Sequence, residues 1–306
     1  MTWAIFLSLL AATVQAGTPI VYATLGEILT EKGGVINLGV EGMMLVGALA
    51  GFVVALHSGS PVLGFVAGGL AGAGMAAIHG LVCIWFLGNQ IVSGLALTIL
   101  GTGLAGFFGT PYIGRTAPGF DKFSLPFLGD IPWIGYIFFQ QDALVYLSFL
   151  IAPLLWAFLR YTRWGMGIRA SGESPAAARA AGLHVQGFRW AAVLGGGVLA
   201  GWGGSYLSLA YTHLWTNGLT SGRGWIAVAL VIFAFWRPER AMLGAYFFGG
   251  VMAFQLRLQA MGTTLPSSIL LMFPYVLTIA ALAFASWRSA RTGAPAALGI
   301  NIEPSE

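Results

Sequence analysis

The stretch EKGGVINLGVEGMMLVGALAG, residues 31–51, decides the fold class. It opens with a charge pair and two glycines, and it ends in an apolar run that can enter a lipid bilayer. Asn37 and Glu41 lie at the start of that run. Ionisable groups inside membranes are costly and usually mark a transport pathway or an ion pair. The carboxylate at this position therefore needs a physical explanation.

The composition of the whole chain indicates a membrane protein. The 306 residues are 58% hydrophobic and 8% charged, whereas soluble domains are about 25% charged. The 45 glycines suit helices that pack closely in lipid. Cys83, the one cysteine, excludes an internal disulfide and offers no metal cluster. We expect an all-α, polytopic integral membrane protein.

Apolar runs and polar breaks predict one transmembrane domain over residues 1–306, with nine to ten helices that include short or broken ones. The expected loops are an external one over about 110–142, a cytoplasmic one over about 160–189 and a cytoplasmic tail over about 288–306. The ten candidate segments cover about 1–16, 18–31, 38–56, 62–87, 90–109, 143–160, 190–211, 223–236, 240–257 and 268–287.

Positive charge sets the orientation, because cytoplasmic connections carry the excess of Lys and Arg. If residues 160–189 are cytoplasmic, ten of the fourteen Lys and Arg lie inside. The other four are Arg115, Lys122, Arg223 and Arg257. With ten spans both termini are cytoplasmic. If 1–31 form one bent span, the N-terminus lies outside and nothing downstream changes. The small basic excess gives no indication of nucleic acid binding.

Two segments, 18–31 and 223–236, are short for an unaided span, and each is bordered by glycine. Short or glycine-interrupted spans in the two halves of a transporter point to the substrate path, because the ends of half-helices place polar backbone at membrane depth. Ordinary tilted helices in thinned lipid are the alternative.

The chain carries no motif of a membrane enzyme. It has no P-loop, no HExxH, no Cys or His cluster and no serine nucleophile elbow. His79 lies within a span without an acidic neighbour, which favours packing over a proton relay. We therefore expect neither catalysis nor a cofactor.

Polar residues at helix starts are the candidates for a substrate pathway. Glu41 suits the positive end of its own helix dipole, and Asn37 suits an N-cap. Contact with the permeating molecule and pairing with a nearby Arg or Lys remain open for Glu41. Asn89, Gln90 and Ser93 form a second polar notch, with capping as the alternative. Arg223, between glycines, reaches either the substrate cavity or the lipid headgroups.

The cytoplasmic loop contains a predicted short helix over 175–181. Ser174 suits the N-cap, Pro175 the first helical position, and Gly182 the C-terminal stop. The helix has a nearly bare alanine face, without lipid to cover or a core of its own to fill. Docking into a partner's groove is the natural use of such a helix, and a plain surface helix is the alternative.

Residues Ala176-Ala177-Ala178-x-x-x-Gly182 resemble the Ala-Ala-x-x-x-Gly portion of the loop found in permease subunits of ABC importers. Ala176 stands where the fullest motif has Glu, and Glu173 lies earlier. The stretches at 26–48, 89–97, 218–238 and 265–278 resemble the nucleoside-type branch within the group that also moves simple sugars and branched-chain amino acids. The similarity covers nearly the whole chain.

This resemblance implies a multi-pass subunit of the bacterial plasma (inner) membrane that works by alternating access. Residues 173–178 and Gly182 would form the coupling helix for a cytoplasmic ATPase. A second homologous permease and an extracytoplasmic substrate-binding protein or lipoprotein would complete the importer. A secondary transporter driven by an ion gradient is the rival class, and it would need intramembrane acids with partners.

Overall fold

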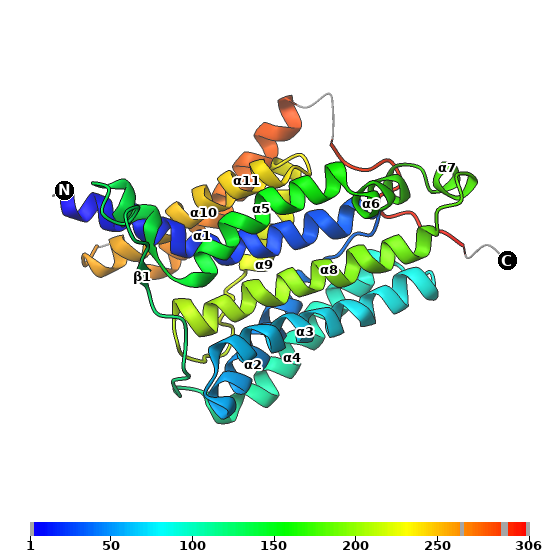
Figure 1. Cartoon of the computed structure of the whole chain (residues 1–306). Helices are drawn as coiled ribbons and strands as arrows, with labels where there is room; N and C mark the ends of the chain where they lie inside the picture. Colours follow the sequence, from blue (N-terminus) through cyan, green and yellow to red (C-terminus); the bar gives the residue numbers. More distant parts are fainter. Residues whose placement is uncertain (1–2, 264–265, 289–292, 304–306) are drawn as a thin grey trace.

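Helix α1 (Trp3–Lys32) runs the length of the molecule (Figure 1). The structure is a computed structural model, and it describes residues 3–263, 266–288 and 293–303. At about 1.5 Å per residue, the 30 residues of α1 extend about 45 Å, which is enough to cross a bilayer. Two separate spans at 1–16 and 18–31 are therefore a wrong prediction.

Helix α1 continues through Gly17 because this glycine allows close packing and does not break the helix. A Cβ atom at Gly17 would lie 2.9 Å from the Ala245 carbonyl oxygen, so the glycine lets α10 approach. The Thr18 hydroxyl donates to the Val14 carbonyl at 2.8 Å, and the helix continues through Pro19. Proline is tolerated in membrane helices where neighbouring groups satisfy the backbone.

The continuous α1 also changes the placement of the termini. The start of α1 lies at one end of the bundle, and the C-terminal segment lies at the other end beside α6 and α7 (Figure 1). The described ends therefore lie at opposite ends of the bundle (Figure 1), as the alternative of one span over 1–31 implies. Which side of the membrane each end occupies stays a prediction.

The first half of the bundle continues with three helices. They are α2 (Val40–Ser58), α3 (Pro61–Gly80) with its π-helical extension η1 (Leu81–Trp85), and α4 (Gln90–Gly109). The loop at 110–142 contains η2 (Thr110–Tyr112), β1 (Phe123–Ser124), the π-helix η3 (Gly135–Phe139) and β2 (Gln140–Gln141). Strands β1 and β2 pair antiparallel, with Phe123 opposite Gln141.

The second half begins with α5 (Ala143–Tyr161), followed by α6 (Arg163–Glu173) and α7 (Pro175–Ala180) in the loop predicted to be cytoplasmic. Then come α8 (Val185–Tyr206) with η4 (Leu207–Tyr211), the short α9 (Arg223–Phe233), α10 (Pro238–Ala260) and α11 (Ser267–Arg288). Helix α6 was not predicted, and the first residues of α8 lie inside the predicted loop 160–189.

Six helices of the described chain are long and apolar enough to cross a membrane. They span Trp3–Lys32, Val40–Ser58, Pro61–Trp85, Gln90–Tyr112, Ala143–Tyr161 and Pro238–Ala260. The all-α class is confirmed apart from the two-residue strands, and the count of nine to ten spans stays a prediction.

Glycines form the crossings between the central helices. A Cβ at Gly26 of α1 would lie 2.5 Å from the Gly196 carbonyl oxygen of α8, and one at Gly72 of α3 would lie 2.2 Å from that of Gly197. A Cβ at Gly47 of α2 would lie 2.6 Å from the Gly201 Cα. These backbones touch directly, as small residues allow in membrane bundles. The close packing holds α2 against α8, and this contact positions the N-terminal end of α2 within the bundle.

Candidate functional site

Two interrupted helix starts meet inside the bundle. Residues 33–39 leave the C-terminal end of α1, turn back along the bundle without helical structure and lead into α2 at Val40 (Figure 1). We call residues 33–39 the re-entrant segment; most of it is buried. From the chain's second half, the loop after η4 leads into α9, whose N-cap Gly222 has φ +76°.

Glu41 joins these two helix starts. Its Oε1 accepts hydrogen bonds from the Thr220 hydroxyl at 2.5 Å and the Gly222 N–H at 2.9 Å. Its Oε2 accepts from the Gly224 N–H at 2.7 Å. The first N–H groups of a helix lack partners within that helix, and the carboxylate supplies them for α9. The negative charge also lies at the positive end of the α9 dipole.

Glu41 lies in the first turn of α2, as the sequence predicts. However, the hydrogen bonds reach α9, across about 180 residues of sequence. Gly224 has no room for a side chain, since a Cβ there would lie 2.5 Å from the Glu41 Cα. Glycine at this position lets the two helix starts approach each other.

Arg223 is buried beside this junction. Its Nη1 donates to the carbonyls of Thr220 at 3.0 Å and Leu219 at 3.3 Å, and its guanidinium carbon lies 5.8 Å from the Tyr211 ring centroid. Its Nε has no hydrogen-bond partner among the described residues. The buried guanidinium of Arg223 therefore keeps one N–H donor for which the described residues provide no acceptor.

Polar side chains from three helices hold the re-entrant segment. Gln90 of α4 accepts from the Ile36 N–H at 2.8 Å, and Glu27 of α1 accepts from the Asn37 N–H at 3.2 Å. His79 of α3 lies between the Ile36 carbonyl at 2.9 Å and the Ser93 hydroxyl at 3.0 Å. Unpaired backbone at membrane depth is costly, so these contacts explain how the segment can lie there without helical hydrogen bonds.

The structure brings Asn37, Gln90, Ser93 and Glu41 together around the re-entrant segment and α9. The N-cap of α2 is Gly39, two residues later than the predicted N-cap Asn37, and the Asn37 side chain accepts from the Gly39 N–H at 2.9 Å. This is a local turn and not a helix cap. The substrate-pathway role of these residues stays a prediction.

Asn89 lies apart from this group. It is exposed and caps α4 by accepting from the Val92 N–H at 3.0 Å, which matches the capping alternative. Of the two predicted short segments, 223–236 is confirmed as the short α9, whereas 18–31 belongs to the continuous α1. The start of α9 meets the start of α2. In the sequence, Gly33 and Gly34 mark the non-helical segment that leads into α2.

Nothing in the sequence indicated Thr220, Glu27 stood out only as an acid near a helix end, and the pattern indicated packing for His79. Glu27 and Glu31 are buried four residues apart on α1, and the Trp236 Nε1–H donates to Glu31. The sequence shows that the two acids lie on one helix face, because they are four residues apart. It does not show that Glu27 accepts from Asn37 and Glu31 from Trp236.

A second arrangement lies around α7, at the end of the bundle where α1 ends (Figure 1). The Ser174 hydroxyl caps α7 at the Ala177 N–H at 3.4 Å, and Gly182 follows the helix with φ +78°. The predicted short helix is thus confirmed to within one residue. Ala176 and Ala177 are exposed, but Ala178 is buried within the chain. The expectation of an alanine face without a core of its own is therefore wrong at Ala178.

Residues 293–303, which we call the C-terminal strap, lie across the same end of the bundle. The Ala297 N–H donates to the Gly172 carbonyl at 2.9 Å, and the Gly299 N–H to the Gly34 carbonyl at 3.1 Å. Asn301 accepts from Gln90 at 2.9 Å and donates to the Gly88 carbonyl at 3.1 Å.

The strap also contacts the coupling loop directly. The Ala296 N–H donates to the Glu173 carboxylate at 3.2 Å, and Arg179 of α7 donates to the Glu303 carbonyl. The strap therefore connects α6 and α7 with the re-entrant segment and the start of α4. The predicted cytoplasmic tail is ordered structure over these eleven described residues.

These features define a class of protein. Apolar helices of membrane-spanning length, interrupted helices whose starts meet inside the bundle, and a short helix at one end of the bundle are the elements of a multi-pass membrane transporter. Sequence comparison gives the family. Residues 9–282 match the model described as branched-chain amino acid transport system / permease component, and the chain belongs to this family.

The relatives are transport permease subunits. A Haloferax volcanii protein provisionally named as the glucose ABC transporter permease protein TsgC13 is 45% identical over 314 residues, which cover 95% of each chain. The nucleoside ABC transporter permease protein NupC of Lactococcus lactis is 34% identical, with 93% of each chain covered. The guanosine ABC transporter permease protein NupQ of Bacillus subtilis is 34% identical, with 89% of each covered. No solved structure matches the chain.

Proposed function

We propose that this chain is the membrane-spanning subunit of an ATP-driven importer for a small polar solute that carries a sugar ring. The observation that carries the proposal is the pair of helix starts joined at Glu41, because such a junction lets two halves of a bundle move while their polar backbone stays satisfied. The family and its permease relatives support the same function.

In transport, the chain would convert a conformational change of a partner ATPase into movement of the starts of α2 and α9. In our proposal the ATPase groove receives α7 through the exposed Ala176 and Ala177. Displacement of α7 pulls on the strap through Arg179 and on α6 through Ser174. The strap passes this displacement to Gly34 and Gln90, which hold the re-entrant segment.

A second permease subunit and an extracytoplasmic binding protein complete the proposed assembly. The loop at 110–142, at the end of the bundle opposite α7, would receive the binding protein (Figure 1). Arg223, with Tyr211 beside it, lies next to the junction and is the residue we assign to the substrate path on this chain.

Two substrates compete within this proposal. The resemblance of residues 26–48 and 89–97, together with NupC and NupQ, supports a nucleoside. The higher identity to TsgC13 supports glucose. Branched-chain amino acids have the support of the family description only.

Competition for uptake by the reconstituted importer tests the function and separates the substrates. We expect ATP-dependent uptake that either guanosine or glucose abolishes and leucine does not. Competition by leucine alone would move the chain to an amino acid importer. Uptake that survives ATP depletion while an ion gradient is intact would identify a secondary transporter, for which Glu27 and Glu31 are the buried acids at hand.

A further inference from the structure

Two acidic residues of α1 are buried side by side within the bundle. Glu27 is 1% exposed and Glu31 is 6% exposed. They lie four residues apart, so their side chains share one face of the helix, and the two carboxyl groups lie within hydrogen-bonding reach of each other. Two ionised carboxylates in this arrangement would repel each other, and burial would add the cost of desolvating both charges. The pair therefore needs a positive charge or a proton.

The described part of the chain provides no counterion in hydrogen-bond contact with the pair. Lys32, the next residue on α1, directs its ammonium to the Gly293 carbonyl at 3.0 Å. Glu27 Oε2 has no hydrogen-bond partner among the described residues, and neither has the buried hydroxyl of Thr24, three residues earlier on the same face. A proton on Glu27 Oε2 would supply the donor that the contact with Glu31 lacks.

The other oxygens of the pair favour a proton over a metal ion. Glu27 Oε1 accepts from the Asn37 N–H at 3.2 Å, and Glu31 Oε2 accepts from the Trp236 Nε1–H. Both donors carry partial positive charge, so they would oppose a cation bound to the same carboxyl groups. One oxygen of each carboxyl is left, which is enough for a shared proton but short of the about six to eight oxygens that Ca²⁺ takes. The described residues contain no group of three His, Cys, Asp or Glu that could hold a metal ion.

The pair ties two non-helical segments to α1. Asn37 belongs to the re-entrant segment that leads into α2, and Trp236 belongs to the turn that follows α9. These segments adjoin the two helices that meet at Glu41. Phe235 and Trp236 have φ +53° and +54°, which non-glycine residues rarely adopt and which persist only where the surrounding contacts hold them. The hydrogen bond to Glu31 is one such contact.

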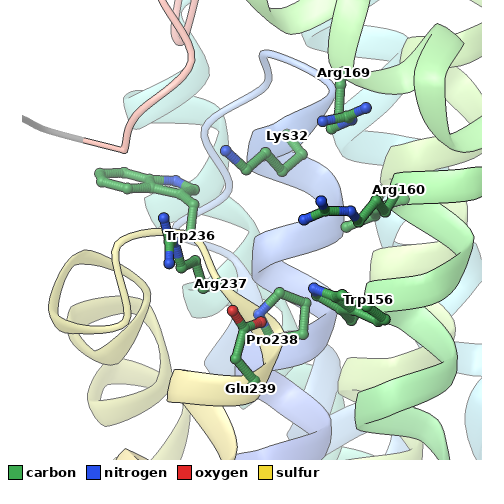
Figure 2. Close-up of a pocket in the computed structure, with 9 residues that line it drawn as sticks. Lys32, Trp156, Arg160, Arg169, Trp236, Arg237, Pro238 and Glu239 are labelled. Atoms are coloured by element: carbon green, nitrogen blue, oxygen red, sulfur yellow. The ribbon is translucent and has the colours of Figure 1, made fainter.

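A cavity of about 580 Å³ opens beside the pair, at the end of the bundle where α1 ends. Trp236 and Lys32 are part of its lining (Figure 2). Trp236 is buried and donates to Glu31, so its indole separates the pair from the cavity. Movement of this one side chain would give water access to the pair. The other charged or titratable groups around the cavity and the re-entrant segment are Arg160, Arg169, Glu173, Arg189, Arg237, Glu239 and His79.

We infer that Glu27 and Glu31 share one proton, and that this proton clamps the re-entrant segment and the turn after α9 to α1. Loss of the proton leaves two adjacent carboxylates, whose repulsion releases Asn37 and Trp236 from α1. The clamped arrangement binds one more proton than the released one, so a rise in pH favours release. The proton enters and leaves through the same cavity, so the clamp moves no net charge across the membrane, unlike the ion coupling of a secondary transporter. That release accompanies transport rests on the proposed function, whereas the shared proton does not.

Infrared spectroscopy of the importer purified with its partner subunits tests the shared proton. At neutral pH we expect a C=O stretching band of a neutral carboxyl group that is present in the wild type and lost in both Glu27→Gln and Glu31→Gln. In either variant the amide NH₂ donates to the remaining carboxylate, so the pair needs no proton and both variants should assemble. Glu239→Gln removes an exposed acid beside the same cavity and, as the matched control, should keep the band.

Two infrared results would overturn the proposal. A band that survives in both pair variants would belong to another acid. A wild type without such a band, whose carboxylate spectrum responds to added Na⁺, would assign the pair to a metal ion.

Hydrogen exchange with mass spectrometry, on the same samples, tests the clamp. After correction for the intrinsic pH dependence of exchange, opening of peptides covering 35–39 and 234–237 should increase about tenfold per pH unit once the shared proton dissociates, because one proton is linked to release. Glu27→Gln should abolish this increase, because its amide donates to Glu31 at any pH while the other groups around the cavity titrate as in the wild type. Equal pH profiles in the two proteins would make the acids a static buried pair and overturn the clamp. Failure of the proposed function would appear instead as absent ATP-dependent uptake, with both measurements as expected.

Discussion

Replacing Glu41 by Gln should loosen the start of α9 without unfolding the bundle. The carboxylate accepts three hydrogen bonds, from Thr220, Gly222 and Gly224. The amide offers one oxygen, and its NH₂ group must face a backbone N–H that then has no acceptor. Loss of one charge-assisted bond costs about 1.5–3 kcal/mol, and the two remaining bonds weaken because the acceptor is neutral. We expect a total of about 3 kcal/mol.

This magnitude separates the junction from a simple dipole effect. A carboxylate that only faces the dipole of its own exposed helix contributes about 0.3–1 kcal/mol. Glu239→Gln is the matched control, because Glu239 is an exposed acid in the first turn of α10. About 3 kcal/mol corresponds to roughly a hundredfold change in the opening equilibrium, whereas the control should change it about fivefold or less.

Hydrogen exchange with mass spectrometry, on the importer purified with its partners, measures this opening directly. Peptides covering 219–226 should exchange about a hundred times faster in Glu41→Gln, while peptides from α3 and α8 keep their protection. Uptake should fall, because α9 no longer moves with α2. An assembled variant with unchanged exchange at 219–226 would refute the capping of α9. Lost uptake with unchanged exchange would instead indicate that Glu41 contacts the solute.

Three other predictions concern the two ends of the molecule. Gly182→Val should uncouple ATP hydrolysis from uptake, because valine resists the positive φ that ends α7. Ala177→Trp should have the same effect, because the indole fills the exposed face of α7. Normal uptake with bound ATPase in both variants would exclude α7 as the coupling helix. A cysteine at Lys122 should react with an impermeant reagent outside intact cells, and reaction only after lysis would reverse the orientation. Asn301→Ala should lower uptake several-fold at unchanged ATPase binding, since it removes the hydrogen bond to Gln90; wild-type uptake would exclude the strap from the coupling path.

The sequence by itself determined the class of protein and much of its local structure. The length of its apolar runs specified lipid as the solvent for most helices, and α4 begins and ends where the sequence predicts. Ser174, Pro175 and Gly182 specified α7 because capping acts between residues that are at most a few positions apart. The re-entrant path of 33–39 was visible only as an unusual pair of glycines and a carboxylate.

Tertiary structure decided how these pieces meet. The glycine at the border of the predicted segments 1–16 and 18–31 indicated a break, but α10 packs against Gly17 and α1 is continuous. The role of Glu41 depends on backbone N–H groups at 222 and 224, and that of Gln90 on Ile36 and Asn301. A side chain's own sequence shows which hydrogen bonds it can make, but the partner is set by which distant backbone the fold leaves unsatisfied beside it. In a bilayer that requirement is strict, and it places the polar residues of this chain at its helix junctions.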